Sequence, residues 1–324
     1  TYGFIYPEKK KYLEPYFGKV MENWKKMQSF DNKLLNIYHY NNEKTKEWAT
    51  VSCWRETDHG WFCQHLVSSG GPLASRAVLL GIQKDFIDNG DSRHFMQNWY
   101  RPNNKYANKV FGSLQNTVGR EISSILHYYF LSVDPTIIVS DHSYRVVKCT
   151  SSDLETLKNF LHLNRHKVHL ESCEFTSENL NLENVSEAYK IMGLKKKRDI
   201  HMALKNNEVV GVSISYRAPI GLNFSFLENR CEIILKSDLQ PESISQIVNS
   251  LLCEVRDVYD DFEGSFIPVV TDGNCALVLA ILGHKFLRKY DQSIWNKNGY
   301  FGWYDNVENI YRKVLSRYKE MVYA

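Results

Sequence analysis

The stretch Asn274-Cys-Ala-Leu-Val-Leu-Ala-Ile-Leu-Gly-His-Lys-Phe286 decides the expected fold, because it directly follows the strand-like run Gly264-Ser-Phe-Ile-Pro-Val-Val-Thr271. Together the two runs predict a buried strand, a polar turn that can cap a helix, a short apolar helix and a return strand. A similar unit lies 170 positions earlier, where Phe95-Met-Gln-Asn-Trp-Tyr100 precedes Asn104-Lys-Tyr-Ala-Asn-Lys-Val-Phe-Gly112. Two copies of one unit predict an internal duplication.

Both copies share the order Asn, then Ala, then an aliphatic residue and a Gly. In this order they resemble the last third of the GNAT (acyl-CoA N-acyltransferase) fold. Each half also runs through helices, three strands, a helix, a strand, a helix and a strand, as GNAT proteins do. The resemblance implies an α+β protein of two tandem GNAT-like domains, each a mixed, mostly antiparallel sheet flanked by helices. We expect the boundary near residue 143, giving an N-terminal domain with leading helices (1–143) and a C-terminal domain (144–324).

Composition narrows the class of protein. The chain has 324 residues, 43% hydrophobic and 24% charged, which is ordinary for a globular protein of two domains. A net charge of +3 makes a nucleic-acid partner an unfavoured expectation, and no run reaches the roughly 18 apolar residues of a membrane span. Seven scattered cysteines without a C-x-x-C pair indicate neither disulfides nor zinc, and favour the cytoplasm. The basic run 195–198 is interpreted as a solvated helix end.

The GNAT resemblance implies an acyl-CoA cofactor, acetyl-CoA or another, whose pyrophosphate would meet the loop opening a helix. The family's loop carries Arg or Gln and two spaced small residues. In the first half the corresponding positions are Ser68, Ser69, Gly70 and Gly71, which keep glycines and hydroxyls but lack the Arg or Gln. In the second half residues 235–242 contain no glycine and two acids. We therefore expect any CoA in the first half; a tight turn before Pro72 is the alternative explanation.

The family usually places a proton-donating Tyr four residues after the motif Ala. Phe111 and Ala280 hold those positions, and neither side chain can donate a proton. Tyr106 is the nearest substitute acid, with packing as the alternative, and Asn104 opens the same helix beside the expected cofactor.

His65 is the candidate general base, in phase with Trp61 and Cys63 on an expected strand. A packed or hydrogen-bonded His is the alternative. The spacing of His162, His166 and His169 would allow them to share one helix face, but the helix expected over residues 154–168 ends before His169. No carboxylate or Cys completes a metal site, so we expect no metal.

Aromatic residues gather on the expected first sheet, as Trp54, Trp61, Trp99 and Tyr100. They would either line a cleft for a small-molecule ligand or form a large aromatic core.

A second resemblance rests on the run Asn98 to Gly112, on Gly221-Leu-Asn-Phe-Ser-Phe226 and on Gly302-Trp-Tyr-Asp-Asn-Val307. These runs are similar to the tandem GNAT-like region that follows a PilZ (cyclic di-GMP-binding) domain in some bacterial proteins. The resemblance implies a signalling output module whose N-terminal sensor domain is missing from this chain, and it assigns cyclic di-GMP to no residue here.

The sequence leaves three functional hypotheses. The missing Tyr and altered loops favour a GNAT-fold ligand-binding or regulatory module with degenerate acyltransferase sites. The alternatives are an acyl-CoA N-acyltransferase that uses the first half, and a Fem-type aminoacyl transferase, which would need a pronounced basic face for tRNA.

Overall fold

The computed structural model describes the chain except residues 1–9, 12, 30–33, 140–142 and 324, and describes side chains as far as residue 316. It comprises two compact units: unit 1 consists of residues 1–126 and 291–324, and unit 2 of residues 127–290. The helix expected over residues 7–30 lies partly outside the described residues, and within them is α2 (Phe17–Gln28). None of the described helices is long and apolar enough to cross a membrane.

The described strands form one hydrogen-bonded sheet in the order β1-β2-β3-β4-β11-β5-β10-β9-β8-β7-β6. Their bounds are β1 (Leu35–Asn42), β2 (Glu47–Arg55), β3 (Gly60–Ser69), β4 (Phe95–Tyr100), β5 (Ser123–Val133), β6 (Arg145–Lys148), β7 (Lys197–Lys205), β8 (Glu208–Arg217), β9 (Cys231–Leu235), β10 (Ile267–Thr271) and β11 (Lys285–Asn296). The α+β class is confirmed. The structure has a single sheet, whereas we expected one for each half.

In unit 1 the strands β1, β2 and β3 are antiparallel, and β3 then pairs in parallel with β4. The helix α3 (Pro72–Asp88) makes the crossover that a parallel pair needs. It buries Val78, Ile82 and Phe86 in the core of this unit. The four aromatic residues expected either in a cleft or in a core are all at most 5% exposed, so they form core.

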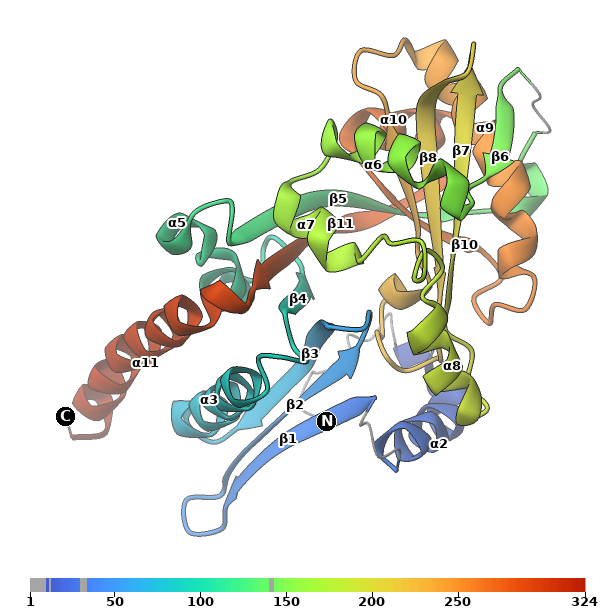
Figure 1. The fold of residues 1–324 in the computed structure, drawn as a ribbon. Coiled ribbons are helices and arrows are strands. Elements are labelled where there is room, and N and C mark those ends of the chain that lie inside the picture. The colour runs from blue at the N-terminus through green and yellow to red at the C-terminus, as the bar shows by residue number, and fades with distance from the viewer. Residues whose placement is uncertain (1–9, 12, 30–33, 140–142, 324) are drawn as a thin grey trace. The chain divides into compact units, whose positions relative to one another are not determined.

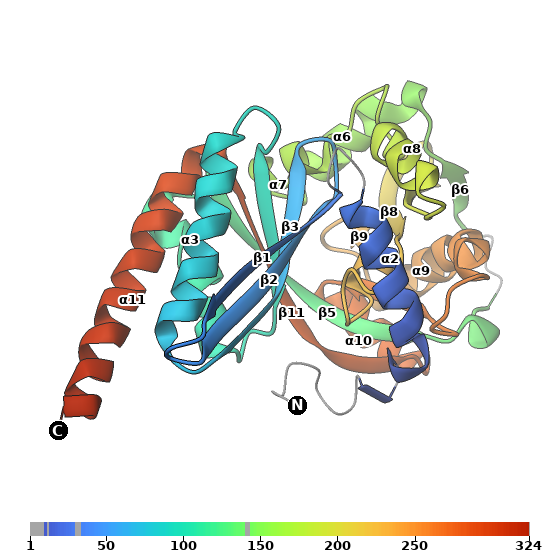
Figure 2. The same ribbon diagram turned by 90° about the horizontal axis from the view of Figure 1, so that it is seen from below.

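The end of the chain completes unit 1. Asp291 to Asn296 of β11 pair antiparallel with β4, and α11 (Tyr300–Tyr323) follows. Trp303 and Val307 of α11 are fully buried in the same core as α3. Both views show α11 running alongside α3 (Figures 1 and 2). The sequence pattern predicts that this segment belongs to the C-terminal domain (144–324).

Unit 2 repeats the arrangement. The strands β6 to β9 are antiparallel, β9 pairs in parallel with β10, and the helix α9 (Pro241–Val255) connects this pair. Ile247 and Leu251 of α9 are fully buried, and Gly211 of β8 lets them approach, since a Cβ there would lie 2.8 Å from Ile247 Cγ2.

The remaining described α-helices of the two units are α4 (Lys105–Ala107), α5 (Gln115–Val118), α6 (Leu154–His162), α7 (Lys167–Cys173), α8 (Glu183–Ile191) and α10 (Gly273–Ile281).

Two expectations about unit 2 were wrong. The helix over residues 154–168 is broken: His162 ends α6, His166 caps α7 in extended conformation, and only His169 is helical and buried. These histidines therefore do not share one helix face. The basic run 195–198 leads into β7 and is not a solvated helix end, because the Lys196 side chain is fully buried and Arg198 is 1% exposed. The boundary at residue 143 stays a prediction.

Candidate functional site

The four residues expected to receive a pyrophosphate lie at the junction between β3 and α3. Ser68 and Ser69 are the last residues of β3, and Gly71 is the N-cap of α3, with Pro72 at its first position. Gly70 has φ +93°, and a Cβ there would lie 2.8 Å from Glu47 Cγ. The backbone conformation and the close approach of Glu47 thus require a glycine at position 70 without any ligand. What the junction contributes to a site is the start of α3.

The parallel strands β3 and β4 separate soon after they begin. They pair only from Gly60 to Phe62 and from Phe95 to Gln97. Beyond that point two side-chain amides span the gap: Asn98 Nδ2 donates to the Cys63 carbonyl, and Gln64 Nε2 donates to the Trp99 carbonyl at 3.0 Å. Two of the backbone acceptors at the separation, the carbonyls of Cys63 and Trp99, therefore already accept from the protein's own side chains.

The short helix after β4 carries the two other expected residues of the first repeat. The Asn104 side chain accepts a hydrogen bond from the Ala107 amide at 3.1 Å, so it caps α4. In the second repeat Asp272, not Asn274, takes this part by accepting from the Cys275 amide at 2.9 Å. Asn104 thus has a local structural function.

Tyr106 lies at the start of a hydrogen-bonded chain of hydroxyls. Its Oη is 2.6 Å from Tyr311 Oη, which donates to Ser75 Oγ at 2.8 Å. Ser75 Oγ in turn donates to the Pro72 carbonyl at 3.1 Å. Burial raises the pKa of Tyr106 and of Tyr311, so both phenols stay protonated at neutral pH.

A cavity of about 620 Å³ lies within unit 1 where α3, α4 and α11 meet. It contains Pro72 and Ser75 of α3 and Lys105 and Tyr106 of α4, and so lies beyond the carboxyl ends of the parallel strands β3 and β4. Ligands of α/β proteins bind at this end of a parallel pair. The volume falls in the range typical of small-molecule sites.

The wall opposite α4 is formed by α11. Lys313 and Val314 line the cavity with Tyr311. Arg76 Nε and Nη2 each donate to Glu308 at 2.9 Å, which fastens α11 to α3 by a bidentate pair.

A second set of contacts holds α11 against the π-helical turn Asn108–Gly112 (η2). Trp303 Nε1 donates to the Val110 carbonyl at 2.8 Å, and Phe111, 4% exposed, stacks on both Trp295 and Trp303. The position where the GNAT family has its acid is thus a core position here.

The cavity is cationic. Lys105, Lys109 and Lys313 line it, and no acidic side chain is among the described residues of its wall. None of the three lysines has an ion-pair partner within the part of the chain whose side chains are described. The cavity could therefore hold an anionic ligand such as an organic phosphate.

His65 does not line this cavity. It lies at an irregularity of the β2–β3 register and has φ +61°, so the strand alternation expected with Trp61 and Cys63 does not reach it. Its ring stacks on Trp24 at 5.9 Å between centroids, and its Nδ1 is 3.1 Å from Ser52 Oγ. His65 is thus not among the residues that line the cavity with Tyr106, and its proposed role as base stays a prediction.

Unit 2 contains a set of buried ion pairs around β9. Arg165 Nη2 lies 2.8 Å from Glu232 Oε1, and Tyr128 Oη donates to the same oxygen at 2.7 Å. Burial opposes ionisation of Glu232, but the charge of Arg165 outweighs it and holds the carboxyl pKa at about 2. Burial lowers the pKa of His169 to about 3, so that ring is neutral. Both groups are fixed in states unsuited to proton transfer near pH 7.

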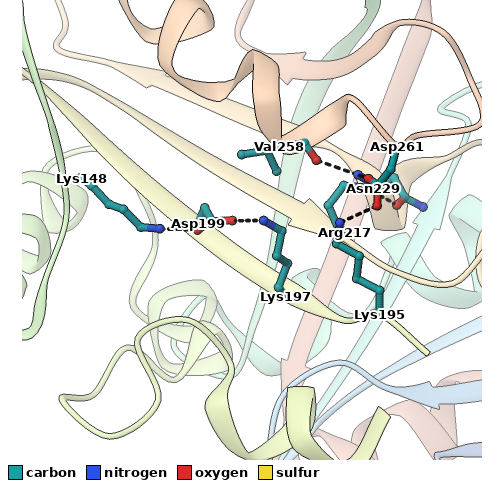
Figure 3. Close-up of polar contacts among 8 residues, drawn as sticks. All are labelled: Lys148, Lys195, Lys197, Asp199, Arg217, Asn229, Val258 and Asp261. Atoms are coloured by element: carbon teal, nitrogen blue, oxygen red, sulfur yellow. Dashed lines mark hydrogen bonds and ion pairs between the residues drawn. The ribbon is translucent and has the colours of Figure 1, made fainter. Parts of the chain in front are cut away.

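Two further ionic groups of unit 2 are drawn in Figure 3. Asp199 lies between Lys148 and Lys197, at 2.8 and 2.7 Å. Arg217 pairs with Asp261 and donates to the Val258 carbonyl at 2.6 Å. These cations already have acceptors, unlike the lysines of the cavity. Among the described residues no group of His, Cys, Asp or Glu could hold a metal ion.

Sequence reasoning missed the part of the site that α11 supplies. Tyr311 and Lys313 lie more than 200 positions from Tyr106, and no motif links them. The helical run of residues 300–316, with three tyrosines, two asparagines and Lys313, was the available signal, but only the pairing of β11 with β4 brings it into unit 1.

No family model and no curated protein matches the sequence. The chain is similar to a GCN5-related N-acetyltransferase-like protein from Streptococcus suis (13% identity, covering 89% of this chain and 98% of that one, TM-score 0.38). It is also similar to a tandem GNAT protein from the clavulanic acid biosynthesis pathway (9%, 85% and 87%, TM-score 0.39) and to a Drosophila protein (11%, 89% and 95%, TM-score 0.44). Because these identities and TM-scores are low, the similarities carry no argument about function, which is argued from the site alone.

Proposed function

We propose that the protein is a GNAT-like ligand-binding module that holds an acyl-CoA in unit 1 and acts through binding, without transferring the acyl group. The observation that carries this proposal is the 620 Å³ cavity beyond the parallel strands β3 and β4, lined by Lys105, Lys109 and Lys313. A CoA carries several phosphate charges, and three unpaired ammonium groups would compensate them at short range.

Two features argue against acyl transfer by the usual GNAT route. The separated strands would normally offer backbone groups to the pantetheine, but here Asn98 and Gln64 occupy the carbonyls of Cys63 and Trp99. Phe111 stands where the family has its acid, and it is packed against two tryptophans. The ligand would therefore be held by its phosphates, with its acyl end free of the strand gap.

The binding test is calorimetric titration with acetyl-CoA and then with decanoyl-CoA. We expect one site per chain in unit 1, with an affinity that falls as salt rises, because exposed lysines are screened. Lys109→Met and Lys313→Met should each weaken binding by about 5- to 20-fold, the range for a lost hydrogen bond to a charged group at a partly exposed site.

The matched control is Lys84→Met, the same change on α3, where Lys84 is paired with Asp88 at 2.6 Å and lies outside the cavity. It should leave the affinity unchanged. Absence of binding, or equal losses in the control and the cavity variants, would overturn the proposal.

The test of inactivity is release of free thiol from acetyl-CoA with glycine, lysine and spermidine as acceptors. We expect no release above the uncatalysed rate. Because the pantetheine would lie outside the strand gap, acetyl-CoA and adenosine 3′,5′-bisphosphate should bind within a few-fold of each other. Much tighter binding of acetyl-CoA would show that the strand gap is used.

N-acyl transfer in unit 1 is the second candidate, favoured by one observation. Tyr106 lines the cavity as a protonated phenol and could reprotonate a departing thiolate. In that case thiol release with an amine would be measurable and would drop in Tyr106→Phe.

The regulatory form of the proposal also needs a partner that reads the bound state. A PilZ-type sensor domain preceding the chain is the partner that the sequence resemblance suggests. Acyl-CoA-dependent association of this chain with such a domain, measured by titration calorimetry, would test it. Equal association with and without ligand would count against a regulatory link.

A further inference from the structure

The hydroxyl chain along the cavity wall has only one allowed direction. A serine or tyrosine hydroxyl has a single proton to donate. Ser75 uses its proton on the Pro72 carbonyl, which cannot donate in return. Ser75 must therefore accept from Tyr311, and Tyr311, its proton thus committed, must accept from Tyr106.

The consequence concerns Tyr106, the first donor of the chain, which lines the cavity together with Ser75 and Tyr311. Its side chain is 40% exposed, and its proton points to Tyr311. Toward the cavity it presents lone pairs only. Because burial raises the pKa of this phenol, it does so as a neutral acceptor over the physiological range.

The cavity thus presents two opposite kinds of polar group. Lys105, Lys109 and Lys313 are donors and carry charge, and Tyr106 is an acceptor. Lys105 and Tyr106 are neighbours in the chain, and Lys109 follows one helical turn later. A complementary ligand has an anionic acceptor and, close to it, a hydroxyl or amine that can donate.

We propose that the cavity selects an organic phosphate with a hydroxyl on the neighbouring carbon, such as a ribose 3′-phosphate with a free 2′-hydroxyl, and that Tyr106 reads this hydroxyl. The inference rests on the proposed function, in which a CoA occupies the cavity, and it places the 3′-phosphorylated ribose there. Tyr106 is then a specificity-determining residue.

The test compares adenosine 3′,5′-bisphosphate with 2′-deoxyadenosine 3′,5′-bisphosphate by calorimetric titration. One neutral hydrogen bond is worth roughly a 3- to 10-fold difference in affinity, so the wild type should prefer the ribose form by that factor. Tyr106→Phe should bind the deoxy form as the wild type does and should lose the preference.

A second variant tests the direction of the chain. Tyr311→Phe frees the Tyr106 proton, so Tyr106 can donate as well as accept; this variant, unlike the wild type, should therefore bind the 2′-O-methyl analogue, which offers only an acceptor, more tightly than the deoxy form. Tryptophan emission follows unit 1, which holds all seven tryptophans, and would show that each variant is folded. Lys84→Met should keep the full preference.

The outcomes separate this inference from the proposed function. Acetyl-CoA binding that depends on Lys109, together with equal affinity for the two bisphosphates, overturns the inference alone. A ribose preference that persists in folded Tyr106→Phe also overturns it. Lack of binding of acetyl-CoA and of both bisphosphates overturns the proposed function and the inference together.

Discussion

Replacing Arg165 by Met should destabilise unit 2 more than any exposed charge change in the chain. The Arg165 side chain is 14% exposed and Glu232 only 2%, and the guanidinium contacts Glu232 Oε1 through Nη2 at 2.8 Å and Nε at 3.2 Å. Methionine keeps much of the volume but removes the charge. Glu232 would remain as a buried carboxylate with Tyr128 as donor and without its paired cation.

The magnitude follows from the pair itself. Breaking a buried ion pair by removing one partner costs about 3 to 5 kcal/mol, because the remaining charge stays desolvated. The pKa of Glu232 gives a similar figure: it lies at about 2 in the fold against an ordinary value of 4.5. That depression, in which Arg165 has the largest share and Arg230 a smaller one, corresponds to about 3 kcal/mol in total.

The sign with pH is fixed by the direction of the shift. A carboxyl whose pKa is lowered on folding stabilises the fold above its unfolded pKa. The contribution of Glu232 is therefore complete above about pH 5 and is lost as the pH falls toward 2. In Glu232→Gln this part of the acid sensitivity should vanish.

The assay is native-state hydrogen exchange at pH 7, read on peptides that cover β9. A loss of about 3 kcal/mol should lower the protection of these amides by about 100-fold. All seven tryptophans lie in unit 1, so an unchanged native emission would show that unit 1 is intact. Lys84→Met, which removes an exposed pair with side chains 78% and 55% exposed, should change β9 protection by less than 3-fold. Protection in Arg165→Met within 3-fold of the wild type would refute the reasoning.

Three further predictions concern burial, backbone and capping. Lys196→Met should cost about 3 kcal/mol by leaving the buried Glu228 without the cation 3.4 Å away, as measured by urea unfolding followed by circular dichroism; a change below 1 kcal/mol would contradict it. Gly70→Ala should cost about 1 to 3 kcal/mol in the tryptophan-detected transition, because of its φ of +93° and the approach to Glu47, and an unchanged midpoint would refute the argument. Asn104→Ala should cost about 1 kcal/mol in the same assay by removing the cap of α4, whereas Asn104→Asp should be nearly neutral.

The order of elements could be predicted from the sequence because it depends on local periodicity. The alternation in 48–54 predicts β2, and the run after Pro72 predicts α3; both lie close to their observed bounds. The sequence predictions were wrong where a local pattern is compatible with two different tertiary environments. The basic run 195–198 is compatible with a solvated surface and also with a buried position that supplies hydrogen-bond acceptors. Arg198 can be buried because the carbonyls of Leu180, Cys173 and Asn179 accept hydrogen bonds from its guanidinium.

The candidate site likewise has one part that the sequence predicted and one part that only the structure shows. Tyr106 and the start of α3, which line the cavity, were predicted as site residues because each belongs to a short strand–turn–helix pattern. The sequence by itself determined the α+β class, the repeated strand–helix unit and a phenylalanine at position 111, where the GNAT resemblance would place a tyrosine. Only the tertiary structure decided that α11 forms the far wall of the cavity and that Tyr311 sets the direction of the Tyr106 proton. The physical reason is that strand pairing between β4 and β11 joins residues about 195 positions apart, and no local periodicity encodes such a contact.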